Sequence, residues 1–136
     1  MDSVMPLTAR CVIIAALAAT ACNSDVTNPA SKVASVAIVS GDQQTASVGS
    51  TLPLPVVLQA MDVNGRPVRG VKIHYIVFGS LITGDPTPGD VFTDASGLAA
   101  TRWSLGAEPG EKIMDGCTDV LVQPRHCVKF TAMAAQ

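Results

Sequence analysis

The residues best suited to chemistry in this 136-residue chain are its four cysteines and two histidines. Cys117 and Cys127 bracket a loop near the C-terminus, and His126 directly precedes Cys127. One interpretation joins these residues with His74 in a zinc site, but the sequence has no Cys-x-x-Cys spacing and no helical pairing of histidines. The other interpretation is a disulfide between Cys117 and Cys127, which requires that the chain be exported.

Motifs of the common catalytic sites are missing from the sequence. The chain has no glycine-rich phosphate loop, no HExxH and no GxSxG. Asp85, Asp90 and Asp94 fall in a loop-rich stretch, where carboxylates usually cap turns and face solvent. The sequence therefore predicts a protein with no catalytic residue, no cofactor and no metal.

The first 21 residues have the composition of an export signal. A short stretch with a single Arg precedes an apolar run that ends at Ala21, and this run is shorter than the about 20 residues of a membrane-spanning helix. Ala19, Thr20 and Ala21, directly before Cys22, resemble the lipobox of bacterial lipoproteins, where cleavage leaves the cysteine at the new N-terminus with lipid attached. The resemblance implies a lipidated Cys22. The alternative is an ordinary secretory signal, in which Cys22 has no such role.

Both alternatives export the protein, and export permits disulfides. We therefore predict a Cys117–Cys127 bond that contributes about 2–3 kcal/mol to stability. Residues 22–33 are polar and aperiodic, which predicts a flexible tether between the lipid on Cys22 and the fold. The expected location is the bacterial cell envelope, with a membrane anchor through this lipid. Asn23 resembles the outer-membrane default of Gram-negative lipoproteins, and a secreted protein is the alternative.

Residues 34–136 are expected to form one small β domain. Hydrophobic residues make up 48% of the chain and charged residues 15%, a composition too apolar for disorder. The net charge is −2 and no basic run occurs, so nucleic acid is excluded as a partner. Frequent Gly and Pro and the lack of an amphipathic helix argue against a helical bundle.

Apolar residues alternate with polar ones along five runs of the chain. The clearest run places Val71, Ile73, Tyr75 and Val77 on one face. The other runs group Val36 with Ile38; Val56 with Leu58 and Ala60; Ala99 with Thr101, Trp103 and Leu105; and Val128 with Phe130, Ala132 and Ala134. Five such strands, with one or two weaker ones, predict a sandwich of two antiparallel sheets.

Short motifs follow one another in order along this domain. They are Ser40-Gly41-Asp42-Gln43-Gln44-Thr45, Val48-Gly49, Leu52-Pro53, Asp62-x-Asn64-Gly65-x-Pro67-Val68-x-Gly70-Val71, Thr93-Asp94-Ala95-x-Gly97-x-Ala99, Trp103-x-Leu105-Gly106 and Val128-x-Phe130-Thr131-Ala132. Together they resemble the bacterial immunoglobulin-like (Ig-like) domain of group 1, the invasin and intimin type. The resemblance implies an all-β, Ig-like antiparallel sandwich of about seven strands. Such domains occur in adhesins and other surface proteins, usually as repeated rod segments.

Two regions depart from the family pattern. Tyr75 stands where the family often has Trp, which exchanges one large core aromatic residue for another. Between residues 112 and 127 the family has a plain strand, a short turn and the last strand. Here Asp115 and Gly116 are expected to interrupt the strand, and the connection is longer. The sequence therefore does not fix the register of the strand around residues 111–122.

Apolar residues after the Tyr75 position form a candidate interaction patch. By alternation Ile76 and Phe78 face outward, and Leu81 and Ile82 follow in the next loop. Either these residues form an exposed patch for a partner, or sheet twist and the loop bury most of them. We expect a non-catalytic envelope lipoprotein whose module serves adhesion or protein interaction, with an unidentified protein or cell-surface ligand. A structural spacer or accessory domain is the alternative, and a small metal-dependent enzyme is less favoured.

Overall fold

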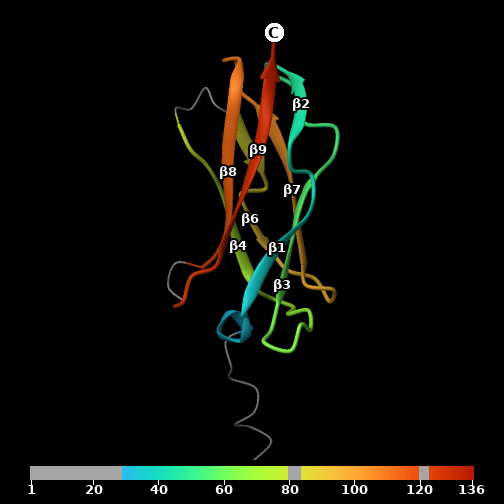
Figure 1. Cartoon of the computed structure of the whole chain (residues 1–136), viewed down its shortest axis with the longest axis vertical. Helices are drawn as coiled ribbons and strands as arrows, with labels where there is room; N and C mark the ends of the chain where they lie inside the picture. Colours follow the sequence, from blue (N-terminus) through green and yellow to red (C-terminus); the bar gives the residue numbers. More distant parts are fainter. Residues whose placement is uncertain (1–28, 80–83, 120–122) are drawn as a thin grey trace, which may run out of the picture.

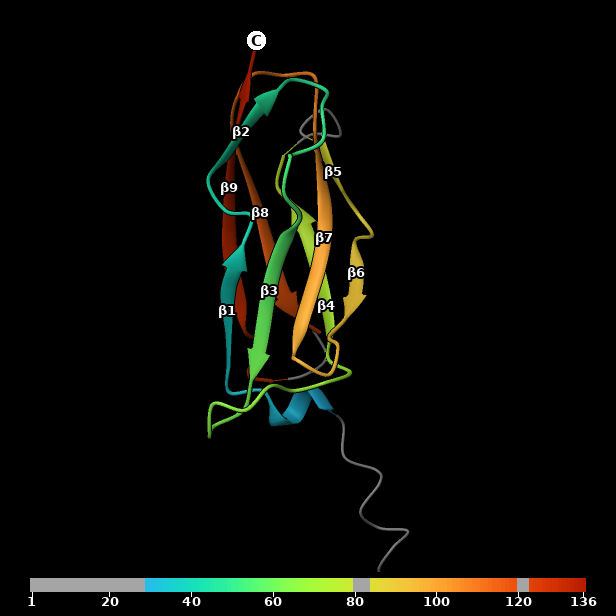
Figure 2. The same cartoon turned by 90° about the vertical axis from the view of Figure 1, so that its right-hand side faces the viewer.

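The chain folds into two β-sheets that pack face to face (Figures 1 and 2). This computed structural model describes residues 29–79, 84–119 and 123–136. One short 3₁₀ helix, η1 (Pro29–Lys32), precedes the first strand. The prediction of an all-β sandwich is confirmed.

One sheet has four strands and the other has five. In spatial order the four-stranded sheet contains β1 (Ser35–Ser40), β3 (Val56–Met61), β7 (Leu98–Leu105) and β5 (Gly84–Thr87). The five-stranded sheet contains β2 (Gln44–Ser47), β9 (Cys127–Ala135), β8 (Gly110–Thr118), β4 (Lys72–Val77) and β6 (Asp90–Phe92). The described residues thus form nine strands, against about seven expected. Three of the nine, β2, β5 and β6, are short edge strands, which give little alternation signal.

The chain changes sheet between β1 and β2. Strands β1 and β2 run in the same direction (Figure 2). In the second sheet β2 pairs parallel with β9, with Gln44 opposite Ala132. The other strand pairs of the described residues are antiparallel. Gly41 makes the crossing with a φ of 87° and is buried against the backbone of Pro55 and Val56. A side chain at Gly41 would overlap that backbone.

The core lies between the sheets and is built from the alternating positions that the sequence predicts. Trp103 and Phe130 are its largest fully buried side chains. The predicted inward residues of β3, β4, β7 and β9 are buried or packed against the core: Val56, Leu58, Ala60, Val71, Ile73, Tyr75, Val77, Ala99, Thr101, Trp103, Leu105, Val128, Phe130, Ala132 and Ala134. In edge strand β1, Val36 packs against the core, whereas Ile38, the last residue before a register shift, is 38% exposed.

The expected interruption at Asp115 and Gly116 is wrong. Strand β8 runs through both residues and pairs with β4 on one side and β9 on the other. Gly116 faces the core, where a Cβ would lie 2.6 Å from Leu58 Cδ2 and 3.0 Å from Tyr75 Cε1. The glycine does not break the strand, because the strand needs a residue without a side chain to pack beneath Leu58 and Tyr75.

Tyr75 joins the two sheets. Its hydroxyl donates a hydrogen bond of 2.6 Å to the carbonyl of Ala99 on β7, and its ring centroid lies 6.2 Å from that of Phe130. Burial raises the pKa of the Tyr75 phenol, because the phenolate would lose its hydration inside the core.

Replacing Gly41 by Ala should destabilise the fold more than the same change at Gly49. Both glycines have positive φ, but nothing lies within 4 Å of a Cβ at Gly49. Gly49→Ala should therefore cost only the conformational strain of about 1–2 kcal/mol. Gly41→Ala should cost about 1–3 kcal/mol more through backbone overlap. Urea unfolding followed by the fluorescence of Trp103, the single Trp, measures both losses, and equal losses would show that the crossing has room for a side chain.

Alkaline pH should unfold the protein through Tyr75. In the unfolded chain the Tyr75 phenol ionises at about pH 10, whereas in the folded protein it keeps its proton at higher pH. The free energy of unfolding therefore falls as pH rises above that point. Tyr75 is the only Tyr, so tyrosinate absorbance reports this residue alone and should rise together with the loss of the β-sheet circular dichroism signal. Tyrosinate formation in a still folded protein is the contrary result.

Candidate functional site

Alternation along β4 divides its side chains between the core and the opposite side of the sheet. Ile73 and Tyr75 point into the core, whereas His74 and Ile76 lie on the side of the five-stranded sheet that faces away from the four-stranded sheet. We call this side the outer face. Phe78, the first residue after β4, continues the alternation and is 55% exposed, and Ile76 is 40% exposed. Two residues of the candidate interaction patch are therefore exposed.

Two further strands add apolar neighbours on the outer face. The backbone N–H of Phe78 donates a hydrogen bond of 3.2 Å to the carbonyl of Ile113 on β8, so these residues are adjacent. Ile113 is opposite Thr131 on β9, and Met133, two residues further along β9, is 44% exposed. We call Ile76, Phe78, Ile113 and Met133 the apolar patch.

The composition of the apolar patch differs from the expectation. Leu81 and Ile82, its other two predicted members, lie outside the described residues. The sequence did not predict Ile113 and Met133 as members of the apolar patch. Their neighbours depend on the pairing of β8 with β4 and β9, and the sequence did not determine that register around residues 111–122. The alternation of Met133 with the core residues of β9 was the one available signal.

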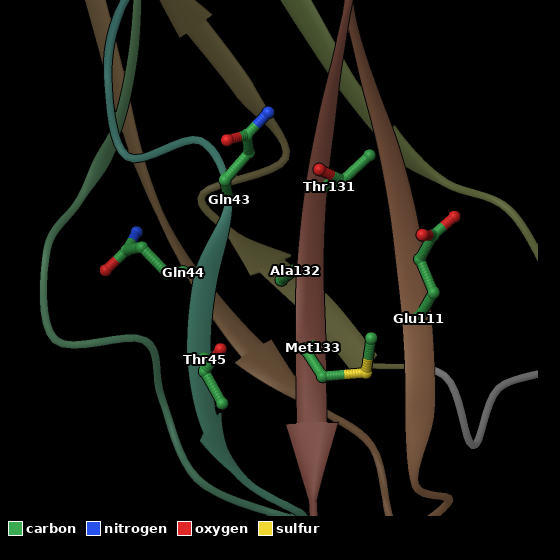
Figure 3. A pocket seen from close by; sticks show the side chains of 7 residues that line it. All are labelled: Gln43, Gln44, Thr45, Glu111, Thr131, Ala132 and Met133. Atoms are coloured by element: carbon green, nitrogen blue, oxygen red, sulfur yellow. The ribbon is translucent and has the colours of Figure 1, made fainter.

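A shallow depression borders the apolar patch on the side of β2. Its volume is about 160 Å³, and it spans β2, β9 and β8 (Figure 3). Met133 extends from β9 toward β8 and belongs to both the depression and the apolar patch. The other lining residues are Gln43, Gln44, Thr45, Glu111, Thr131 and Ala132. This small, open hollow suits the side chain of a larger ligand better than an enclosed small molecule.

The other half of the outer face contains a group of charged and ionisable side chains. His74 Nδ1 lies 2.6 Å from Asp90 Oδ1, and Lys72 Nζ lies 3.4 Å from Asp90 Oδ2. The hydrogen bond from His74, followed by that from Lys72, holds the pKa of the Asp90 carboxyl below its ordinary value. Because the carboxylate is exposed, these pairs organise the surface and add little to stability.

The predicted disulfide between Cys117 and Cys127 is present and joins β8 to β9. It occupies the two cysteines of the proposed zinc site. Across residues 29–79, 84–119 and 123–136, no three His, Cys, Asp or Glu side chains are grouped to hold a metal ion. His126 pairs through its backbone with Thr118, next to the disulfide, whereas His74 lies on β4 opposite Cys117.

The three carboxylates considered for catalysis are not brought together. Asp85 lies on β5 of the four-stranded sheet, and Asp90 lies on β6 of the five-stranded sheet. Asp94 accepts hydrogen bonds from the backbone N–H groups of Ser96 and Leu98, as expected of a turn residue. The arrangement provides no pair of carboxylates for acid–base chemistry.

Comparison with known proteins places the fold. No family model matches the chain, and no curated protein matches it. The ASH/PapD-like domain of human CEP192 (PapD-like domain 7) superposes with a TM-score of 0.51 at 16% identity, over 82% of this chain and 90% of that one. The D00-D0 domain of intimin superposes with a TM-score of 0.50 at 14% identity, over 76% of this chain. The fold is an Ig-like β-sandwich.

The intimin likeness confirms at the level of fold the resemblance to invasin and intimin domains. The chain spans 47% of the length of that intimin structure. A conjugative transposon lipoprotein from Bacteroides eggerthii also matches, with a TM-score of 0.47 at 10% identity over 72% of this chain and 94% of that one. Within the part of the chain that the structure describes, we find no helix with the length and hydropathy of a membrane span.

Proposed function

We propose that this protein is a non-catalytic envelope lipoprotein whose single Ig-like module binds a protein or cell-surface ligand through the apolar patch. The observation behind the proposal is the exposure of Ile76 and Phe78 at the end of β4 and of Met133 on β9, on the same sheet face with β8 between them. Exposed clusters of large apolar side chains mark interaction sites, because a partner that covers them removes apolar surface from water. Aromatic and Met side chains are also enriched at interfaces. The adjacent depression offers a place for a partner's side chain.

The position of the apolar patch suits an N-terminal anchor. The described chain begins at η1, at one end of the sandwich, and the C-terminus lies at the other end (Figure 1). Phe78 and Ile113 lie beyond the centre of their strands toward the C-terminal end, since β8 begins at Gly110 and β4 ends at Val77. A lipid on Cys22, at the start of the tether proposed for residues 22–33, would therefore hold η1, which lies at the end of that range, toward the membrane. The apolar patch would then lie on the side of the sandwich, nearer the end that is away from the membrane.

A spacer is the second candidate function. The placement of η1 and the C-terminus at opposite ends of the sandwich is the arrangement that a rod segment needs (Figure 1). A spacer requires only a stable sandwich with ends that point apart, and it makes no use of exposed apolar residues. The two functions therefore differ in what a change to the apolar patch should do.

Site-specific crosslinking in cells that make the full chain with its own leader distinguishes the two functions. A photo-reactive residue in place of Ile76 should give a discrete adduct, whereas one in place of Arg102, exposed on the four-stranded sheet, should not. Phe78→Ser should reduce the adduct at least about tenfold, the loss expected when one well-packed interface aromatic is truncated.

The matched control is Phe92→Ser. Phe92 is an exposed aromatic of the same sheet, 64% exposed, but it lies on β6 opposite Lys72 and outside the apolar patch. This variant should keep the adduct, and both variants should change stability by no more than about 0.5 kcal/mol. Equal labelling from positions 76 and 102, or equal effects of the two Phe substitutions, would favour the spacer.

A further inference from the structure

The disulfide lies in one cross-strand row with two ionisable side chains. Cys117 is opposite Cys127 on β9 and opposite His74 on β4, and His74 is in turn opposite Asp90 on β6. Directly opposed residues of neighbouring antiparallel strands place their side chains on the same face. The outer face therefore aligns two sulfurs, an imidazole and a carboxylate, in that order.

The two sulfur positions differ in access. Cys127 is an exposed residue at the start of β9, whereas Cys117 is 2% exposed. Of the two cysteines, Cys127 is therefore the more accessible to a nucleophile from solvent. Attack on Cys127 makes Cys117 the leaving group, and Cys117 is the cysteine that has His74 as its neighbour.

His74 is oriented to interact with a group other than Asp90. Its Nδ1 is held by the 2.6 Å hydrogen bond to Asp90. Its Nε2 is buried and has no hydrogen-bond partner among the described residues. A carboxylate at one ring nitrogen fixes the tautomer and leaves the other nitrogen to exchange a proton with a second group. The neighbour across the row is Cys117.

We propose that this row is a thiol–disulfide exchange site, in which a dithiol reductant attacks Cys127 and the Cys117 thiolate leaves toward His74. The thiolate of the dithiol forms a bond to Cys127 Sγ, the Cys117–Cys127 bond breaks, and its electron pair stays on Cys117 Sγ. The imidazolium form of His74 stabilises this thiolate or gives it a proton. The second thiol of the dithiol then displaces Cys127, so the dithiol is oxidised to a disulfide and the protein gains two thiols.

The other charges around the row are balanced. Besides His126, which precedes Cys127 and also has a buried Nε2 without a hydrogen-bond partner in the described part of the chain, the charged groups on the strands and strand ends beside the row are Lys72, Asp90, Asp115, Asp119, Arg125 and Lys129. These are three cations and three anions, and the salt bridge between Lys72 and Asp90 cancels two of them. His74 is the ionisable residue directly opposite Cys117, and Asp115 lies two residues away on the same face of β8. This exchange does not depend on the proposed binding function.

The rate of disulfide reduction tests the exchange site in the full chain. Dithiothreitol near pH 7 is the reductant, and alkylation followed by mass spectrometry of the peptide that contains Cys117 reads the reaction separately from the other cysteines. His74→Ala should slow reduction about 5- to 10-fold, because the leaving thiol loses its stabilising neighbour. The matched control, His126→Ala, removes the other histidine and should change the rate less than twofold. Equal rates in the two variants, or reduction of the wild type only after unfolding, overturn the proposal.

The pKa of the Cys117 thiol gives a readout that a purely structural His74 would not move. In a Cys127→Ser chain, the pH dependence of Cys117 alkylation should give a pKa below the ordinary value of about 8.5. Adding His74→Ala should raise it, and Asp90→Asn, which keeps the imidazole in place, should raise it less. A pKa at or above the ordinary value with and without His74 is the result that burial alone would give, and it contradicts the proposal.

Discussion

The register of β4 against β8 is the constraint on which both faces of the five-stranded sheet depend. On the inner side, Gly116 leaves room for Tyr75 and Leu58, and Tyr75 reaches across to Ala99 of the other sheet. Because side chains alternate, a slip of one residue would place Tyr75 on the outer face and turn His74 into the core. A buried imidazole without its carboxylate partner would be costly, so the same contacts that build the core also fix the surface.

That register divides the outer face into two parts. Toward the C-terminal end of the sandwich lies the apolar patch, where Phe78 is adjacent to Ile113 and Ile76 is opposite Asp115. Toward the η1 end lies the row in which the disulfide is opposite His74. The disulfide joins β8 to β9 at this end of the sheet, one residue before β8 ends at Thr118 and at the first residue of β9.

Sequence reasoning predicted what local alternation determines. The inward residues of β3, β4, β7 and β9 followed from a period of two, because each of these strands has one face in the core. The turn role of Asp94 followed from the Asp-x-x-Gly spacing, and the disulfide followed from export and the position of the two cysteines. In each case the deciding interactions are close in sequence or lie on one strand.

Features that depend on distant segments were not predictable in the same way. From the sequence, Gly116 predicts an interrupted strand, because its packing against Leu58 and Tyr75 comes from other strands. The parallel pairing of β2 with β9 depends on the sheet change at Gly41, and the pairing of His74 with Asp90 depends on a three-residue edge strand. The apolar patch likewise gains Ile113 and Met133 only through cross-strand register, whereas its chain-local members Ile76 and Phe78 were found from alternation.

We propose an exported sandwich that a lipid on Cys22 holds at its η1 end, with the outer face open to a partner. Intact mass spectrometry of the protein from membrane and soluble fractions, expressed with its own leader, tests this anchor. We expect a chain that begins at Cys22, has the added mass of attached acyl chains and lies in the membrane fraction. A Cys22→Ser variant should lose both the lipid mass and the membrane location. An unlipidated chain in the soluble fraction, or one that begins at another residue, would contradict the proposed anchor.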